Sequence, residues 1–267
     1  MDMKIVFCGG GAMAEGILGG ILDNGVVAPE NVTMNELLEP RCKYLNEKYK
    51  VNAVPEATEE IRAADLVIIA VNPFQVPTVT KTIRPLVNGN TIILSIAAGI
   101  TLGALSDQLG SDKKILRVMP NTLIKSGNGY SAVCVNENID DDDKNVITTV
   151  VNALGQTMYI KEDMFDTFTG FCCTGPVWLY KTAEALIDAG VYAGFSRTES
   201  RNMVIKNMLG TAQVLDETGV HPAMKVDEMT SPSGVGIEAL QTLQQERFAG
   251  ALLTSVDAAV KKANSMK

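Results

Sequence analysis

Histidine is scarce in this chain of 267 residues, and features that would bind nucleic acid or span a membrane are missing. His221 is the only histidine, so a zinc site built from imidazoles is not expected. No apolar run reaches the roughly 18 residues that span a bilayer. The net charge of −8 leaves no basic excess, and a nucleic-acid binder needs a positive face that displaces counterions. We therefore expect no metal, no nucleic acid and no membrane as partner.

The cysteines form neither a C-x-x-C pair nor the spacing of a secreted disulfide framework. Cys172 and Cys173 are adjacent, a geometry that disfavours a bond between them. We interpret all the cysteines as reduced thiols used as small apolar residues. The sequence starts directly with an expected strand and a glycine turn, without the segments of a signal peptide. We expect a cytoplasmic protein.

Short apolar runs that end in glycine, proline or other small residues fill the first half of the chain. Strands are expected over residues 4–8, 32–34, 51–54, 65–71, 91–96, 115–119 and 131–135, and helices between them include 12–22 and 41–49. Runs that are apolar throughout and alternate with helices are typical of a parallel sheet covered on both faces. The sequence therefore predicts an α/β fold with a Rossmann-type, doubly wound parallel sheet over residues 1–161.

The second half, residues 162–267, shows no strand pattern and is predicted to be an all-helical domain. Helices are expected over residues 165–193, 197–218, 223–229 and 237–263. The first of these is long for a domain of this size and carries apolar residues on more than one face. Such a helix needs a second partner to bury it. We therefore expect a homodimer through this domain, or a higher homo-oligomer.

The run Gly9-Gly10-Gly11-Ala12-Met13-Ala14 fits the pattern G-x-G-x-x-A between a strand and a helix. Gly9 permits a tight turn, and Gly11 lets a pyrophosphate approach the backbone. The start of the helix at Ala12 and Met13 offers free N–H groups and a positive dipole end. In this setting the motif predicts dinucleotide binding.

The second strand ends at Asn35 and Glu36. A carboxylate at this turn accepts hydrogen bonds from the hydroxyls of an adenosine ribose and repels a 2′-phosphate. The nearest arginine, Arg41, falls on the following helix. The alternative is that Glu36 is only an exposed loop carboxylate. The pattern favours NADH over NADPH slightly.

The carboxyl ends of the later strands complete the expected cofactor site, because ligands of open α/β sheets bind at that edge. The candidate residues there are Val71, Asn72, Pro73, Ala97, Ala98 and Asn121.

Two runs in the first half, 95–101 (SIAAGIT) and 117–122 (RVMPNT), resemble the pyrroline-5-carboxylate reductases. The helical half continues the resemblance in the family's order with Gly175-Pro176, the run 184–191, His221-Pro222 and Thr230-Ser231-Pro232. The resemblance implies that Δ1-pyrroline-5-carboxylate, or a closely related cyclic imino acid, is reduced to L-proline with NADH or NADPH, a step of proline biosynthesis. It also implies helical domains that interleave between two subunits.

The resemblance places the substrate between the nicotinamide and the loop 229–236, whose N–H groups and hydroxyls hold the substrate carboxylate. The substrate-binding residues that it implies are Thr174, Met229, Thr230, Ser231, Gly234, Val235 and Gly236. No catalytic residue is assigned, because hydride transfer to a protonated imine depends mainly on binding and orientation.

Several positions differ from the family's pattern. Gly236 replaces a threonine whose hydroxyl lies near the imine nitrogen, and Ser233 replaces a glycine of the same loop. Asn72 replaces a lysine, Ala57 replaces an asparagine that contacts the cofactor, and residues 172–174 read C-C-T instead of S-G-S. So many changes around one site indicate an altered cofactor or substrate.

Two other functions remain open. One is a β-hydroxyacid-type dehydrogenase of similar architecture, in which Lys181 on the long helix would be the general acid. The other is a non-catalytic relative that binds a dinucleotide and acts through protein contacts.

Overall fold

A computed structural model describes residues 2–265, which form two compact units. The first unit comprises the described residues up to Cys173 together with those from Val260 onward, and the second is Thr174–Ala259. The last helix, α12 (Phe248–Asn264), therefore contributes to both units. The domain division expected at residues 161 and 162 stays a prediction.

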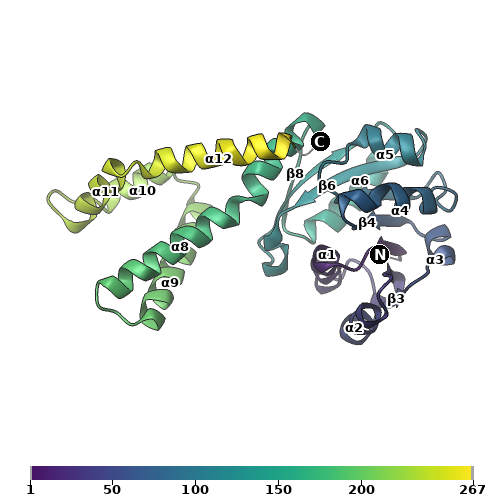
Figure 1. The fold of residues 1–267 in the computed structure, drawn as a ribbon, viewed down its shortest axis with the longest axis horizontal. Helices are drawn as coiled ribbons and strands as arrows, with labels where there is room; N and C mark the ends of the chain where they lie inside the picture. Colours follow the sequence, from purple (N-terminus) through teal and green to yellow (C-terminus); the bar gives the residue numbers. More distant parts are fainter. Residues whose placement is uncertain (1, 266–267) are drawn as a thin grey trace. The chain divides into compact units, whose positions relative to one another are not determined.

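Among the described residues, eight strands form a single sheet in the order β3-β2-β1-β4-β5-β6-β7-β8 (Figure 1). The strands are β1 (Ile5–Cys8), β2 (Val32–Asn35), β3 (Asn52–Val54), β4 (Leu66–Ile69), β5 (Ile92–Ser95), β6 (Lys114–Pro120), β7 (Tyr130–Val135) and β8 (Gln156–Tyr159). All neighbours are parallel except β6 and β7, which are antiparallel. The expected doubly wound sheet is confirmed, with an antiparallel pair and a strand, β8, that the sequence pattern did not indicate.

Helices cover both faces of this sheet, which explains why its central strands are apolar at every position. Ile5 and Phe7 of β1 belong to the core under α1, α2 and α6, whereas Val6 and Cys8 belong to the core under α3, α4 and α5. These helices are α1 (Ala12–Asp23), α2 (Glu39–Tyr49), α3 (Thr58–Arg62), α4 (Val76–Ile83), α5 (Leu102–Leu109) and α6 (Asp141–Asn152). Short 3-10 turns are η1 (Pro29–Asn31), η2 (Pro73–Gln75), η3 (Thr122–Ser126) and η4 (Glu162–Met164).

The remaining helices differ from the expected ones at two places. They are α7 (Phe165–Phe168), the π-helical turn η5 (Thr169–Cys173), α8 (Gly175–Tyr192), α9 (Arg197–Thr218), α10 (Pro222–Glu228), α11 (Val235–Gln245) and α12. The single helices expected over 165–193 and 237–263 are therefore wrong. Pro176 has no N–H to donate to an earlier turn, so a new helix starts there. Arg247 has a left-handed φ of 54°, which separates α11 from α12.

The second unit has almost no interior of its own. Within Thr174–Ala259 only Pro176, Ala183 and Ser200 are buried. Helices α8 and α9 lie side by side (Figure 1), and Trp178 Nε1 donates to Ser255 Oγ at 2.8 Å, which links α8 to α12. Many large apolar side chains of this unit are exposed in the single chain.

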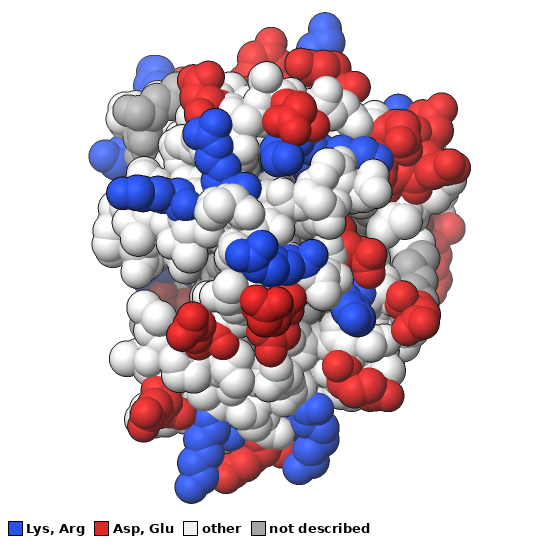
Figure 2. All heavy atoms as spheres, turned by 90° about the vertical axis from the view of Figure 1, so that its right-hand side faces the viewer, with Lys and Arg blue, Asp and Glu red and all other residues white. Residues whose placement is uncertain are grey.

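Two surface properties bear on a membrane or a nucleic acid as partner. Within residues 2–265, no helix combines the length and apolarity that crossing a membrane requires. On the face shown in Figure 2, acidic and basic side chains of the described residues are interspersed, and neither sign forms a continuous patch.

Candidate active site

The glycine turn lies at the point where the direction of strand order changes, because β1 is flanked by β2 and β4. Gly9 has a φ of 105°, and a Cβ added there would lie 2.8 Å from the carbonyl oxygen of Ala70. Gly9 N also donates to Asn35 O at 2.9 Å. Gly9 is therefore required both by its backbone conformation and by the closeness of β4.

Gly11 has a different role from Gly9. It is the residue that precedes α1, with φ −67° and ψ −178°, and nothing lies within 4 Å of the position of an added Cβ. No side chain caps the first N–H groups of α1. The cradle is thus open at Gly11 and offers unpaired backbone donors, as an anionic pyrophosphate requires.

The two residues at the end of β2 face different neighbours. Glu36 is half-buried, and its carboxylate accepts hydrogen bonds from Gly10 N at 2.8 Å and Leu38 N at 2.9 Å. The carboxylate is therefore held over the glycine turn and is not a free loop charge. Asn35 Nδ2 instead donates to Pro55 O at 2.8 Å, so this side chain ties β2 to the end of β3.

Arg41 lies on α2 as expected, but its side chain returns to the glycine turn. Its Nε donates to Gly10 O and its Nη2 to Glu15 Oε2, both at 2.6 Å. Because Arg41 lies on a helix, it was not expected to contact the turn. An arginine in the first turn of that helix is close enough for its side chain to contact the glycine turn, and its place so early in the helix was the sequence signal for this contact.

The later strand ends bring further expected residues to the same edge of the sheet. Val71 touches the position of an added Gly9 Cβ, at 2.9 Å from Val71 Cγ1, whereas Asn72 and Pro73 are exposed. Ala97 is buried after β5, and Ala98 is half-buried. All of these side chains belong to the first unit.

Asn121, at the end of β6, is only 5% exposed. Its Oδ1 accepts from Leu123 N and Tyr130 N, both at 3.2 Å, and its Nδ2 donates to Cys172 Sγ at 3.7 Å. The side chain thus fixes the turn that follows β6. Ala57, which stands where the family has an asparagine, is buried in the core beside α3.

The adjacent cysteines pack against the same turn. Cys173 Sγ contacts Pro120 O at 3.8 Å. Burial raises the pKa of Cys173 to about 12, and burial also raises the pKa of Cys172. Both thiols therefore stay protonated at neutral pH, so neither is a nucleophile there.

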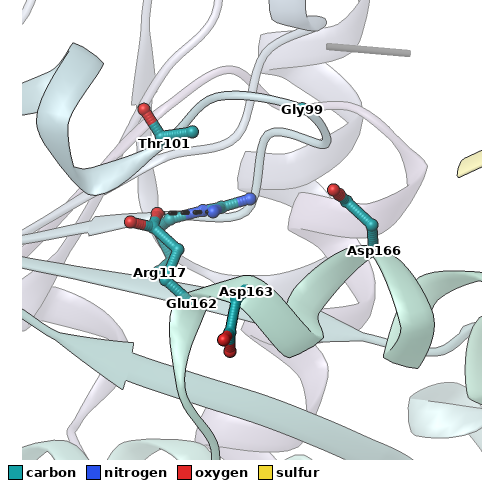
Figure 3. A pocket seen from close by; sticks show the side chains of 6 residues that line it. All are labelled: Gly99, Thr101, Arg117, Glu162, Asp163 and Asp166. Carbon is teal, nitrogen blue, oxygen red and sulfur yellow. Dashed lines mark hydrogen bonds and ion pairs between the residues drawn. The ribbon is translucent and has the colours of Figure 1, made fainter. Parts of the chain in front are cut away.

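A cavity of about 240 Å³ behind this edge is lined by Gly99, Thr101, Arg117, Glu162, Asp163 and Asp166 (Figure 3). Arg117 is 3% exposed; its Nη1 donates to Glu162 Oε1 at 2.6 Å, and its guanidinium lies 4.5 Å from the centre of the Phe165 ring. Glu162 Oε1 also accepts from Leu102 N at 2.6 Å. The ion pair joins β6 to η4, and the bond from Leu102 N joins η4 to the start of α5. The sequence signal for this buried ion pair was a charged residue, Arg117, within the apolar run ILRVM.

Replacing Arg117 with Met is expected to lower the free energy of unfolding by about 3 kcal/mol, because Glu162 loses its partner. This is the lower end of the range for buried pairs, since the Glu162 side chain is 33% exposed. Thermal or denaturant unfolding of the purified variant measures it. The double variant Arg117→Met/Glu162→Leu, which leaves no unpaired charge, should recover part of the loss. Equal stability of wild type and Arg117→Met would contradict this role.

The loop 229–236 lies in the second unit, between α10 and α11. Thr230 Oγ1 donates to Val226 O at 3.0 Å, and Gly234 N donates to Ser231 O at 3.0 Å. Gly234 precedes α11 without a side-chain cap. The loop therefore leads into the unpaired N–H groups of an eleven-residue helix.

The backbone of this loop explains the departure at Gly236 but not the one at Ser233. A Cβ at Gly236 would come closer than 3.0 Å to the carbonyl oxygen of Met229, so a threonine does not fit in this conformation. Ser233 has a left-handed φ of 56°, which favours the glycine found in the family. Of the other expected substrate residues, Val235 is the first residue of α11, and Thr174 directly precedes α8.

Lys181 does not have the surroundings of a general acid in the single chain. It is exposed and forms an ion pair with Glu184 one turn further along α8. The hydrogen bond that Lys181 donates to the Glu184 carboxylate raises the pKa of Lys181. His221 caps α10, where its Nδ1 accepts from Ala223 N at 3.2 Å.

Comparisons with known proteins agree with these features. Residues 162–266 match the family model described as pyrroline-5-carboxylate reductase dimerisation, and residues 4–99 match that of the coenzyme F420-dependent NADP oxidoreductases. The pyrroline-5-carboxylate reductase of Glycine max is 32% identical over 97% of this chain and 94% of its own.

Solved structures show the same likeness. A pyrroline-5-carboxylate reductase from Coxiella burnetii has a TM-score of 0.92 and 25% identity, over 99% of this chain and 98% of its own. The Plasmodium falciparum pyrroline carboxylate reductase, solved with NADP bound, has a TM-score of 0.88 and 29% identity over the same shares. With the glycine turn, the helical unit and full-length similarity in agreement, the chain belongs to the pyrroline-5-carboxylate reductase family.

Proposed function

We propose that this protein reduces Δ1-pyrroline-5-carboxylate, or a closely related cyclic imino acid, to L-proline with NADH or NADPH. The observation that carries the proposal is the open glycine cradle at the strand-order switch, in a chain that belongs to this family over its full length. The cofactor supplies the hydride, and the protein binds and orients the two reactants. In this proposal the protein is an enzyme of proline biosynthesis.

In this proposal the residues of the first unit hold the dinucleotide. Gly9 and Gly11 shape the turn, and the first N–H groups of α1 at Ala12 and Met13 bind the pyrophosphate. Glu36 accepts from the adenosine ribose, using the lone pairs that its bonds to Gly10 and Leu38 leave free. The nicotinamide end of the dinucleotide lies against the turns after β4, β5 and β6. The residues of these turns are Val71, Asn72, Pro73, Ala97, Ala98 and Asn121.

The decisive experiment is to follow the oxidation of NADH and NADPH at 340 nm on adding pyrroline-5-carboxylate. Six-membered cyclic imino acids are compared as substrates, and 3-hydroxyacids are tested with the oxidised cofactors. Turnover of the five-membered imino acid supports the proposal. Activity with 3-hydroxyacids alone would replace it with the dehydrogenase alternative, and dinucleotide binding without turnover would indicate the non-catalytic one.

We further propose that NADH binds at least as tightly as NADPH. The carboxylate of Glu36 is fixed at the end of β2, where a 2′-phosphate would meet like charge. Fluorescence titration with both reduced cofactors measures the two dissociation constants. A clear preference for NADPH would overturn this assignment of Glu36.

For the substrate, we propose that its carboxylate binds at Ser231 and at the N-terminus of α11, with Thr174, Met229, Thr230, Gly234, Val235 and Gly236 lining the pocket. The loop offers a hydroxyl and unpaired N–H groups, the donors that an anion prefers. Helical domains from two copies of the chain form a homodimer, or a higher homo-oligomer. The functional division then follows residues 1–161 and 162–267.

Replacing Ser231 with Ala should raise the KM for the imino acid about ten- to a hundredfold, the loss of one charge-assisted hydrogen bond. The Kd of the dinucleotide should stay almost unchanged, because Ser231 belongs to the substrate loop. Ser231→Thr, which keeps the hydroxyl, is the control. Equal weakening of cofactor and substrate would instead assign the loop to the nicotinamide.

A further inference from the structure

A cluster of charged and aromatic side chains lies directly behind the glycine turn. The Glu15 cluster consists of Glu15 on α1 and Arg41, Tyr44, Lys48 and Tyr49 on α2. Glu15 Oε2 accepts from Arg41 at 2.6 Å. Glu15 Oε1 accepts from Lys48, Tyr44 and Tyr49, each at 2.9 Å. One carboxylate thus gathers four donors from the neighbouring helix.

This arrangement fixes the position of Arg41. Besides its bond to Glu15, the guanidinium donates from Nε to Gly10 O at 2.6 Å and lies 4.9 Å from the centre of the Tyr44 ring. The pair is partly buried, with side chains of Arg41 and Glu15 that are 26% and 14% exposed. Contacts on three sides hold the guanidinium in one place.

Arg41 is also close to the ribose end of the proposed dinucleotide. Glu36 accepts from Gly10 N, and Arg41 donates to Gly10 O, so a carboxylate and a guanidinium bind the same residue of the turn. An arginine near this turn is the group that accommodates a 2′-phosphate in dinucleotide-binding folds. Arg41 is thus the cation nearest to such a phosphate, but its charge is already paired with the carboxylate of Glu15.

Glu15 is ionised near neutral pH. Burial alone would raise the pKa of Glu15, but the hydrogen bonds from Lys48, Arg41, Tyr44 and Tyr49 outweigh it and hold the pKa well below its usual range. A change of pH near neutrality therefore does not release Arg41. Only removal of the Glu15 charge does.

We propose that Glu15 is a specificity-determining residue, which withholds Arg41 from a 2′-phosphate and so favours NADH. The inference rests on the proposed dinucleotide site and adds a second element to Glu36. Glu36 repels the 2′-phosphate directly, whereas Glu15 removes the cation that would attract it. Glu15 itself acts through Arg41 and does not touch the dinucleotide.

The test measures the dissociation constants of NADH and NADPH by fluorescence titration of the wild type, Glu15→Gln and Glu15→Gln/Arg41→Met. Glu15→Gln should bind NADPH about tenfold more tightly relative to NADH, because the released guanidinium gains one charge-assisted hydrogen bond. The double variant should lose this gain. An unchanged ratio of the two constants, whether or not both are weakened, would overturn the proposal. The Glu15 cluster would then only stabilise the packing of α1 against α2.

A second variant keeps the test independent of how well Glu15→Gln folds. Arg41→Met in the wild-type background should change the Kd of NADPH by less than about twofold, because Arg41 is already withheld. A large, selective loss of NADPH affinity would show that Arg41 reads the phosphate in the wild type, which overturns the proposal. Lys48→Met, which removes the other cation of the cluster, should not favour NADPH. If the wild type binds neither cofactor, the proposed function fails before this inference is tested.

Discussion

A variant with Leu209 replaced by Asp is expected to be a monomer without reductase activity. Leu209 lies on α9 and is 60% exposed in the single chain, in a unit whose buried residues are Pro176, Ala183 and Ser200 alone. A helical unit with so little interior cannot be stabilised by its own packing. A second copy of the chain is the economical cover for these helices, and the match to a dimerisation model over residues 162–266 agrees with this.

The extent of the apolar surface explains the size of the expected effect. In the single chain the exposed apolar side chains of α8, α9, α11 and α12 include Val177, Leu179, Tyr180, Leu186, Val191, Tyr192, Met203, Leu209, Val214, Val235, Leu243, Phe248 and Leu253. A charge buried among such residues costs several kcal/mol unless it is paired. In the proposed dimer the second copy covers this surface, so the loss of the dimer should also lower the stability of α8 and α9.

Light scattering during dilution, with activity followed in parallel, checks this expectation. Asn207→Asp places the same charge on α9 at an exposed polar position and serves as the control, which should stay dimeric and active. Full activity from a Leu209→Asp species with the mass of one chain would contradict an obligate dimer. So would wild-type activity that persists after complete dissociation.

Much of the first unit could be predicted from local sequence because its signals are strong and short-range. The apolar runs of β1, β4 and β5 are buried on both faces, so composition alone marks them as strands. By contrast, β8 reads QTMY and is exposed or half-buried at each position. An edge strand of this kind carries no apolar pattern, and pairing with β7 alone defines it.

The errors in the helical half have a similar physical origin. Periodicity continues through Thr169–Cys173 and through Arg247, so a pattern of apolar residues does not show where the backbone changes conformation. Pro176 was visible in the sequence, and its missing N–H was sufficient reason to end one helix and begin another. The tight approach of Gly170 to the backbone of Val260 is a tertiary contact that no local pattern contains.

The positions of the candidate site residues were predictable where they depend on the backbone and less so where they depend on side-chain partners. The glycine turn and Glu36 lie at the sheet edge where the motif places them. The bonds of Asn35 to Pro55, of Asn121 to Cys172 and of Arg117 to Glu162 join residues far apart in sequence. Such pairs depend on how segments pack, which one sequence does not reveal.

The two outer glycines of the turn should give opposite results when each is replaced by Ala. Gly11→Ala should leave stability nearly unchanged, because its φ is ordinary and no atom lies within 4 Å of the added Cβ. It should nevertheless weaken NADH and NADPH binding about tenfold or more, since the methyl group occupies the space where the pyrophosphate approaches. Unfolding curves and fluorescence titrations of the same samples separate the two effects.

Gly9→Ala should lose both stability and cofactor binding. The residue has a φ of 105°, and the new Cβ would lie 2.8 Å from Ala70 O and 2.9 Å from Val71 Cγ1, so both β1 and β4 must shift. Backbone strain of this kind alone costs about 1–2 kcal/mol. Gly25→Ala isolates that strain, because Gly25 has a φ of 62° with nothing within 4 Å and lies after α1, outside the turn. Gly25→Ala should therefore be mildly destabilised and bind the cofactors normally. If Gly11→Ala also bound them normally, the dinucleotide would not approach the turn at Gly11, and the proposed cofactor site would be wrong.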